Sequence, residues 1–276
     1  MSPGGSVQVI GITQRFGGLT AVDDVHVAIP AGAIHGIIGP NGAGKTTLLN
    51  IISGLQRPTS GTVQVGEHQI TGWPGHRLVT KARMVRTFQT VRLFGSMTVQ
   101  QNIEIAAGTV HRGRQQRDRR TAEVIAELGL ESHAADPATS LSYGLQRQVE
   151  LARVLVADPL VVLLDEPAAG LSPTERHDLA QTLRVMNGRG ITVVLVEHHM
   201  DLVHAVCQTC TVLDFGAVIS SGTPQEVTRD PAVLEAYLGG SHHAVADDLV
   251  IESADERVAD ERVADERVAD EQVGEQ

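Results

Sequence analysis

Aromatic residues are scarce in this sequence of 276 residues. One Trp, two Tyr and four Phe make up only 3% of the chain. The hydrophobic content is nevertheless 42%, which is enough to support a packed core. That core must therefore be built from Val, Leu, Ile and Ala.

Long apolar runs are also missing. A membrane-spanning helix needs about 20 consecutive apolar residues, whereas the longest runs here, Leu160–Leu164 and Ile191–Val196, have only the length of a strand. The first ten residues, MSPGGSVQVI, lack the charged region and the apolar stretch of a signal peptide. We therefore expect a soluble, cytoplasmic chain.

Cysteine is limited to Cys207 and Cys210, which have C-x-x-C spacing. A redox or metal site would need a suitable helix start or further ligands, and nearby His198, His199 and His204 make a zinc site conceivable. Short motifs often match by accident. We prefer the interpretation in which Cys207 ends an amphipathic helix and Cys210 begins the strand CTVLDF.

The net charge of −11 lies mostly in one terminal segment. Residues 241–276 hold 12 Asp/Glu and 3 Arg, and from 254 to 273 they repeat ADERV three times and then ADEQV. A period of five matches neither a helix nor a strand, so we expect a solvated, disordered tail. The other residues carry 21 acidic and 19 Lys/Arg side chains, and this near-neutral balance gives no support for broad nucleic-acid binding.

One basic run, HRGRQQRDRR at residues 111–120, carries five Arg against one Asp. Contact with nucleic acid is one interpretation, but no aromatic residue interleaves with these Arg residues for base stacking. We expect a solvated turn in a helical region, with lipid headgroups as its possible neighbours.

Strands and helices are predicted to alternate before the tail. LVVLLDEP and ITVVLVEH fit buried parallel strands, and residues 98–140 are mostly helical. VQVIGITQRF and HVAIPAG fit an antiparallel pair, and TVLDFGAVISSG fits a hairpin. We therefore predict a mixed α/β domain over residues 1–240, with a helical subdomain at about 90–145, followed by the tail at 241–276.

The segment GPNGAGKTT fits the phosphate-binding pattern G-x-x-x-x-G-K-[ST] between a predicted strand and a predicted helix. Gly42 and Gly44 allow backbone N–H groups to curl around phosphates. Lys45 reaches the β- and γ-phosphates, the Thr46 hydroxyl can hold Mg²⁺, and the helix dipole adds a positive end. We predict that the whole segment binds the nucleotide: Gly39, Pro40, Asn41, Gly42, Ala43, Gly44, Lys45, Thr46 and Thr47.

A second anchor is the segment LVVLLDEP. Asp165 emerges at the C-terminal edge of this buried strand, where ligands of α/β proteins bind, and would hold Mg²⁺. Glu166 is placed to polarise a water molecule for attack on the γ-phosphate. Together with the phosphate loop, these two acids predict nucleotide hydrolysis.

The segment LSYGLQRQVELAR resembles the LSGGQ signature of ATP-binding cassette (ABC) ATPases. Ser142 and Gly144 match the signature, whereas Tyr143 and Leu145 depart from it. The resemblance implies a P-loop ATPase with a RecA-like core, an antiparallel β subdomain and an inserted α-helical subdomain. It also implies that the signature helix faces the γ-phosphate of ATP on the opposite subunit. A capping hydroxyl and bare amides at a helix start suit an anion.

Three further residues follow the order of this family. Phe16 in QRFGGLTAV matches the aromatic residue that stacks on adenine. Gln89 in RTFQTVRLF matches the glutamine that contacts Mg²⁺ and water, and His198 matches the switch histidine that contacts the γ-phosphate. The resemblance covers residues 7–238 and implies ATP and Mg²⁺ as cofactors. It gives Glu166, His198 and Gln89 catalytic roles, with Thr46, Gln89 and Asp165 as metal ligands.

Within the family, MVRTFQTVRLFGSMTVQQN, DEPAAGLSP and VLEAYLG resemble the ATPase of branched-chain amino acid importers. This resemblance implies a second ATPase subunit, identical or paralogous, two membrane permeases and, indirectly, an extracytoplasmic solute-binding protein. The chain would then lie at the cytoplasmic face of the membrane through the permeases. The apolar residues after Gln89 form the expected docking surface for a permease, although some must be local core: Val91, Leu93, Phe94 and Met97.

The sequence departs from the family pattern at three more positions. Ser172 in AAGLSP stands where an Asp is usual, and Gln101 stands where Glu is common. His199 follows the switch histidine where Asp is usual. None of these departures removes a residue that hydrolysis requires.

The sequence therefore predicts the ATP-hydrolysing subunit of an importer, with branched-chain amino acids as the solute. An importer for urea, short amides or another small polar solute stays open, because specificity resides in the other subunits. A soluble ABC ATPase outside transport is a third hypothesis. Such proteins generally carry tandem cassettes or long coiled coils, whereas this chain has one cassette and no heptads.

Overall fold

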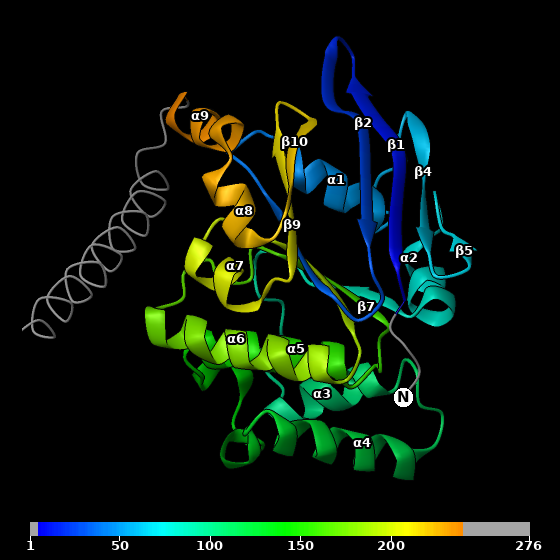
Figure 1. Ribbon diagram of the computed structural model, residues 1–276. Coiled ribbons are helices and arrows are strands. Elements are labelled where there is room, and N and C mark those ends of the chain that lie inside the picture. The colour runs from blue at the N-terminus through cyan, green and yellow to red at the C-terminus, as the bar shows by residue number, and fades with distance from the viewer. Residues whose placement is uncertain (1–4, 240–276) are drawn as a thin grey trace, which may run out of the picture.

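The computed structural model describes residues 5–239, which form two β-sheets with helices around them (Figure 1). The first sheet is antiparallel and has the strand order β2-β1-β4-β5. Its strands are β1 (Val7–Phe16), β2 (Leu19–Ile29), β4 (Ser60–Val65) and β5 (His68–Gln69). The expected pairing of the two N-terminal strands is confirmed. The tail predicted at 241–276 lies outside the described residues.

The second sheet has the strand order β10-β9-β3-β8-β7-β6. Its strands are β3 (Ile34–Ile38), β6 (Met84–Arg86), β7 (Val161–Asp165), β8 (Thr192–Val196), β9 (Thr209–Asp214) and β10 (Ala217–Gly222). All neighbours pair in parallel except β10, which forms the expected hairpin with β9. Every residue of β3, β7 and β8 is buried, as in the centre of a parallel sheet that is covered on both faces.

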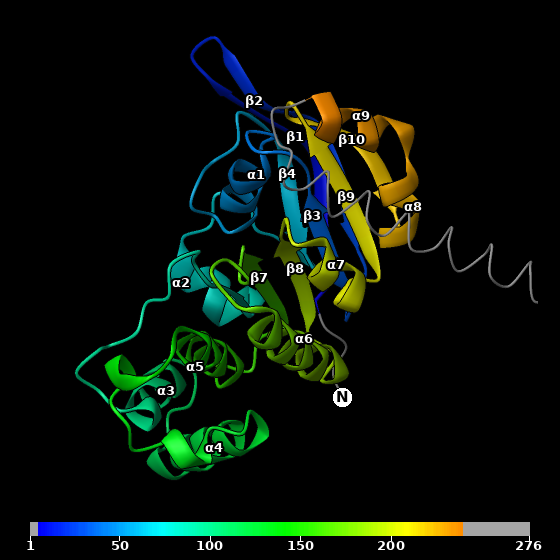
Figure 2. The ribbon, with the colours of Figure 1, turned by 90° about the vertical axis from the view of Figure 1, so that its left-hand side faces the viewer.

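The helices of the described part connect and cover these sheets. They are α1 (Lys45–Ile52), α2 (Gly75–Arg77), α3 (Val99–Ala107), α4 (Arg114–Glu127), α5 (Tyr143–Leu155), α6 (Pro173–Gly188), α7 (Met200–Val206), α8 (Pro224–Arg229) and α9 (Pro231–Gly239). Thr98, Ser172 and Thr223 each begin a helix with a capping box. Helices α3, α4 and α5 lie together at one end of the molecule (Figure 2). Between residues 5 and 239 no helix has the length and apolar character needed to cross a membrane.

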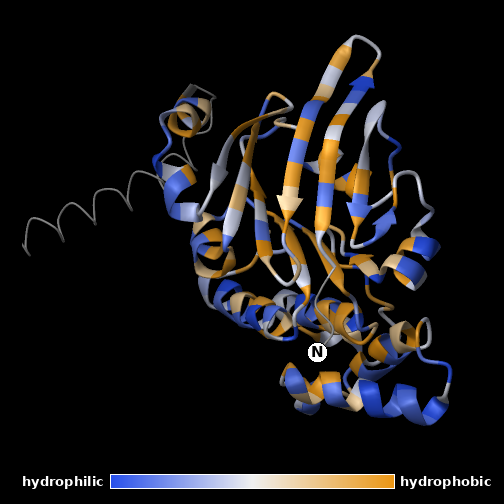
Figure 3. Ribbon diagram, turned by 45° about the vertical axis from the view of Figure 1, so that its right-hand side comes forward, coloured by the Kyte–Doolittle hydropathy of each residue, from blue (hydrophilic) through white to orange (hydrophobic). Residues whose placement is uncertain are grey.

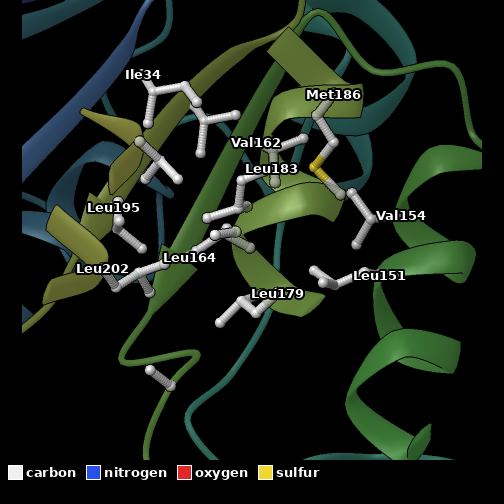
Figure 4. Packing of buried hydrophobic residues seen from close by; sticks show 14 of the residues in the cluster. Ile34, Leu151, Val154, Val162, Leu164, Leu179, Leu183, Met186, Leu195 and Leu202 are labelled. Carbon is white, nitrogen blue, oxygen red and sulfur yellow. The ribbon is translucent and has the colours of Figure 1, made fainter. Parts of the chain in front are cut away.

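The hydrophobic core forms two clusters because side chains alternate between the faces of the six-stranded sheet. On β7, Val162 and Leu164 belong to one cluster, whereas Val161 and Leu163 belong to the other. Figure 4 shows the first cluster, where side chains of α5 and α6, such as Leu183, meet those of the sheet. The buried members are almost all aliphatic, as the scarcity of aromatic residues predicted.

The expectation of a turn in the basic run at 111–120 is wrong. Helix α4 begins at Arg114, so most of the run is helical, and Figure 3 shows a hydrophilic half of this helix. The physical reason is the spacing of its charges. Arg114 lies 3.7 Å from Asp118, and Arg119 lies 3.5 Å from Glu123. Such i,i+4 pairs each favour a helix by a few tenths of a kcal/mol, about 0.3–0.5.

Candidate functional site

The phosphate loop joins the end of β3 to the start of α1, as predicted. Gly39, Gly42 and Gly44 all have positive φ, at 142°, 83° and 98°. A Cβ on Gly39 would lie 2.0 Å from the carbonyl oxygen of Leu213, and one on Gly44 would lie 2.5 Å from that of Ala21. The backbone can therefore follow this path only with glycine at both positions.

The loop encloses a cavity of about 280 Å³. Its walls combine the loop itself, the start of β2, the residue after β7 and the turn between β9 and β10. The lining residues are Leu19, Thr20, Ala21, Asn41, Gly42, Ala43, Gly44, Lys45, Thr46, Thr47, Glu166 and Phe215. The structure thus brings most of the predicted loop and one predicted catalytic acid to a single cavity.

Lys45 lies within this loop and is 6% exposed. Its Nζ donates hydrogen bonds to the carbonyl oxygens of Gly39 at 2.6 Å and Pro40 at 2.8 Å. Burial lowers the pKa of Lys45, while the nearby Glu166 and Asp165 carboxylates oppose that shift. An ammonium group has three donors, so two bonds to the loop leave one N–H for a ligand in the cavity.

Asp165 ends β7 and is held by Arg86 of β6. The two side chains are each 9% exposed and form an ion pair at 2.9 Å. Arg86 also donates to Asn50 Oδ1 and Ser53 Oγ of the α1 region, both at 2.7 Å. Arg86, to which no sequence pattern pointed, fixes this carboxylate and ties the helix after the phosphate loop to the sheet.

The folded chain places Glu166 next to Gln89, and both residues were predicted to take part in catalysis. The amide Nε2 of Gln89 donates to Glu166 Oε2 at 2.9 Å. The backbone of Glu166 has φ of 43°, and its N–H donates to the carbonyl of Val196 at 2.9 Å. A non-glycine residue in this region stores strain of about 1–3 kcal/mol, so the surrounding structure must hold the backbone of Glu166 in place, while Gln89 holds its carboxylate.

A buried arginine connects Gln89 to helix α5. Arg147 is 1% exposed, and its guanidinium donates to the carbonyls of Phe88 at 3.2 Å and Gln89 at 2.7 Å. It also pairs with Glu150 at 2.5 Å. Burial raises the pKa of Glu150, and Arg147 opposes that shift. Sequence reasoning missed Arg147, although a charged residue within the apolar stripe of a helix is a signal that could have revealed it.

The signature segment begins helix α5 at its predicted place. Ser142 is the N-cap, and its side chain accepts a hydrogen bond from the N–H of Leu145 at 3.3 Å. The N–H of Gly144 donates to Glu175 Oε1 at 3.2 Å, and Glu175 belongs to the capping box of Ser172 on α6. Neither Ser142 nor Gly144 lines the phosphate cavity, so one copy of the chain does not bring these elements together.

Phe16 and His198 lie near the site without lining the cavity. Phe16 ends β1, is 50% exposed and pairs in register with Leu19, which does line it. The His198 side chain, just after β8, is 39% exposed. Phe215 does line the cavity and was not predicted to do so. It is 89% exposed at a turn with φ of 43°, and an aromatic residue before Gly in a hairpin was its sequence signal.

A second cavity, which we call the Phe94 groove, has a volume of about 530 Å³. Its walls come from the segment around β6 and from α3 and α5, and they include Val85, Phe88, Phe94, Ile105, Glu150, Arg153 and Val154. Phe94 is 45% exposed, whereas Leu93 packs against the core. The exposed surface of the groove is mostly apolar, although Arg86, Arg92 and Arg153 also line it, and Phe88 of its wall precedes Gln89 in the chain.

Comparison with known proteins gives a consistent result. The family model described as "ABC transporter" matches residues 22–169, and the model described as "Branched-chain amino acid ATP-binding cassette transporter" matches residues 217–243. The chain is 39% identical over 249 residues to the high-affinity branched-chain amino acid transport ATP-binding protein BraF of Pseudomonas aeruginosa. That alignment covers 84% of this chain and 97% of BraF.

Solved structures share the fold. The ADP conformation of MJ1267, an ATP-binding cassette of an ABC transporter, is 29% identical, with a TM-score of 0.78 over 86% of this chain and 99% of that one. The dimeric structure of MJ0796, a bacterial ABC transporter cassette, is 28% identical, with a TM-score of 0.70 over 79% of this chain and 98% of that one. The fold class predicted from the sequence is confirmed.

We predict that Lys45→Ala weakens ATP binding by about 10- to 100-fold. The reason is that a hydrogen bond to a charged group contributes about 1.5–3 kcal/mol, and each 1.4 kcal/mol is about tenfold in affinity. Titration with a fluorescent ATP analogue measures the change. Lys81→Ala removes an exposed lysine outside the cavity and serves as the control. Equal affinities of the two variants would contradict the assignment of Lys45.

Proposed function

Because this chain belongs to the ABC transporter family, we propose that it is the ATP-hydrolysing subunit of an importer for branched-chain amino acids. The observation that carries the proposal is a path of contacts from the Phe94 groove to the phosphate cavity. Phe88 and Glu150 line the groove, and Arg147 binds both Glu150 and the backbone of Phe88 and Gln89. Gln89 then binds Glu166. A partner seated in the groove would thereby act on the hydrolysis site.

The phosphate cavity supplies the ATP site in this proposal. The loop from Gly39 to Thr47 cradles the phosphates, with Lys45 on the β- and γ-phosphates, and Phe16 stacks on adenine. Glu166 accepts a proton from the attacking water, Gln89 orients that water, and His198 contacts the γ-phosphate.

The residues proposed for Mg²⁺ fit that ion by their chemistry. Thr46, Gln89 and Asp165 offer hydroxyl, amide and carboxylate oxygens, which Mg²⁺ prefers. When bound, Mg²⁺ would neutralise charge that develops on the phosphates. Arg86 holds Asp165 Oδ2 at 2.9 Å, at the edge of the sheet where the phosphate loop lies.

A second cassette, identical or paralogous, completes the proposed site. Ser142 and Gly144 begin α5 but do not line the cavity of their own chain. Across a dimer, the start of α5 would meet the phosphates held by the other subunit, where a helix N-terminus favours negative charge. Closure of the dimer would then depend on ATP.

Two membrane permeases are the proposed occupants of the Phe94 grooves of such a dimer. They would hold the cassettes at the cytoplasmic face of the membrane and receive solute from an extracytoplasmic binding protein. An importer for urea, short amides or another small polar solute would use the same cassette, so BraF and the C-terminal family match are what favour branched-chain amino acids. The same two matches also favour a transport subunit over a soluble ABC ATPase outside transport.

The first test of this proposal is co-purification of the tagged chain from native membranes, followed by mass spectrometry. Two hydrophobic permeases and a cassette should accompany it, because the groove and the incomplete site each need a partner. Deletion of the gene should abolish high-affinity uptake of labelled leucine, with uptake of an unrelated sugar as the control. Recovery of only soluble partners would refute the transport assignment.

We predict that Glu166→Gln lowers ATP turnover by about 10²- to 10⁴-fold, the usual contribution of a general base. Binding of ATP should persist, because the phosphate loop is unchanged, and the variant should accumulate as a closed dimer on size-exclusion chromatography with ATP. Glu67→Gln, on the exposed turn between β4 and β5, is the matched control. Turnover near that of the unmodified chain would show that Glu166 is not the proton acceptor.

The paired substitution Val91→Asp and Phe94→Asp should abolish transport while ATP binding is kept. Charge in an apolar contact at the centre of an interface costs about 2 kcal/mol or more, so pull-down of the permeases should fail. Leu238→Asp, at an exposed position on α9, is the control. Loss of ATP binding by the paired variant would mean that these residues support the fold instead of a partner.

A further inference from the structure

A fully buried carboxylate lies between β8 and α7, directly before the proposed γ-phosphate contact. Glu197 is 0% exposed. Its Oε1 accepts the N–H of Ala168 at 2.8 Å. Its Oε2 accepts the backbone N–H groups of His198 at 2.8 Å and His199 at 3.1 Å. The same oxygen accepts a hydrogen bond from the ring Nδ1 of His199 at 3.0 Å. One side chain thus receives four donors from two loops.

These two loops are the ones that carry the proposed hydrolysis residues. Ala168 lies two residues after Glu166 in the turn that follows β7, and the N–H of Ala169 bonds to the carbonyl of Glu166. His198 is the neighbour of Glu197 on the other loop. The carboxylate therefore sets the distance between the backbone that bears Glu166 and the backbone that bears His198.

The cluster also has the composition of a metal site. Donor atoms of Glu197, His198 and His199 all lie within 4.8 Å of one another. A metal ion would need carboxylate lone pairs, however, and both oxygens of Glu197 already accept hydrogen bonds in its buried position. An ion bound by Glu197 would displace some of these buried N–H donors and leave them without an acceptor, which is unfavourable. A hydrogen-bonded clamp fits the geometry better.

We propose that Glu197 is a positioning residue that holds Glu166 and His198 in register for hydrolysis, and that protonated His199 is its counter-charge. The inference rests on the proposed ATPase function and adds a pH-sensitive step to it. Of the two imidazoles near Glu197 Oε2, that of His199 is the closer, at 3.0 Å against 3.8 Å for His198. When His199 loses its proton, the buried carboxylate keeps its backbone donors but loses this positive charge, so the clamp loosens.

The surroundings of His199 support this assignment. The hydrogen bond to Glu197 raises the pKa of His199, and burial opposes that shift. The charges of Arg176 on α6 and Asp201 on α7 also face it, but they form an ion pair with each other at 2.8 Å. The His198 ring lies 4.1 Å away between centroids. Behind Glu197, the buried thiol of Cys207 has a pKa raised by its hydrogen bond with Cys210 and by burial, and so adds no charge.

The sign of the pH dependence follows from these directions. The pKa of His199 is raised in the folded chain. The ion pair between His199 and Glu197 therefore stabilises the folded clamp fully at pH values below the ordinary histidine pKa. This stabilisation is lost as the pH rises through the raised pKa of His199. Burial raises the pKa of Glu197, but the hydrogen bonds from His199, Ala168 and His198 together outweigh it, so the pKa of Glu197 is lowered. Glu197 therefore stays ionised while His199 loses its proton.

The test compares kcat for ATP hydrolysis against pH in the full-length chain, Glu197→Gln and His199→Asn. The unmodified chain should lose activity as pH rises through the raised pKa of His199. In Glu197→Gln the loss of activity should begin at lower pH. The value of kcat should also fall about tenfold or more, because the amide NH₂ of glutamine would face backbone N–H groups and cannot accept their hydrogen bonds. His199→Asn should lack this pH-dependent loss of activity. His177→Asn, exposed on α6, should retain it.

A second readout does not depend on activity. NMR titration of histidine-labelled full-length chain, with the His199 signal assigned from His199→Asn, should show a lower His199 pKa in Glu197→Gln. Equal His199 pKa values, or equal pH profiles in all variants, would overturn the clamp. If the unmodified chain hydrolyses no ATP, the proposed function fails while the titration still decides the clamp. If Glu197→Gln does not fold, the His199→Asn variant alone decides. A kcat that still falls with rising pH in His199→Asn, as in the unmodified chain, would refute the proposal.

Discussion

A guanidinium group buried to 1% exposure must be supplied with acceptors by the protein around it. Arg147 finds them in the carbonyls of Phe88 and Gln89 and in the carboxylate of Glu150. This requirement fixes the path of the segment after β6 against α5, and with it the position of Gln89 beside Glu166. The wall of the Phe94 groove follows from the same contacts. One buried charge thus sets the relation between the helices at one end of the molecule and the nucleotide-binding sheet.

Paired charge is the common feature of the site. Asp165 has Arg86, Glu197 has His199, and Lys45 is held by its own loop between two carboxylates. Each of these three groups therefore has a compensating neighbour, which limits the cost of its burial. The phosphates of ATP would enter a region whose cations are already oriented, so little rearrangement would be needed to bind them.

Local patterns made much of this arrangement predictable from the sequence. The phosphate loop, the β9–β10 hairpin and the buried strands depend on neighbouring residues, and each was found at its expected place. The pairing of Arg147 with carbonyls 58 and 59 residues away, and that of Glu197 with Ala168, 29 residues away, depend on tertiary packing. No local pattern encodes such pairs. The error at α4 had a different origin, because the overall polarity of the basic run does not show its helix-favouring i,i+4 spacing: Arg114 pairs with Asp118 inside the run and Arg119 with Glu123 just after it.

The contacts of the phosphate loop also bear on how the chain is made. Gly39 packs against the carbonyl of Leu213, and the N–H of Gly216 bonds to the carbonyl of Ala43. Strand β3, which leads into the loop, pairs with β8 and β9. A nascent chain leaves the ribosome N-terminus first, so the phosphate-loop segment is synthesised long before the segments that hold the loop in its folded conformation. Nucleotide binding would begin only after the β9–β10 hairpin emerges, when most of the polypeptide has been synthesised.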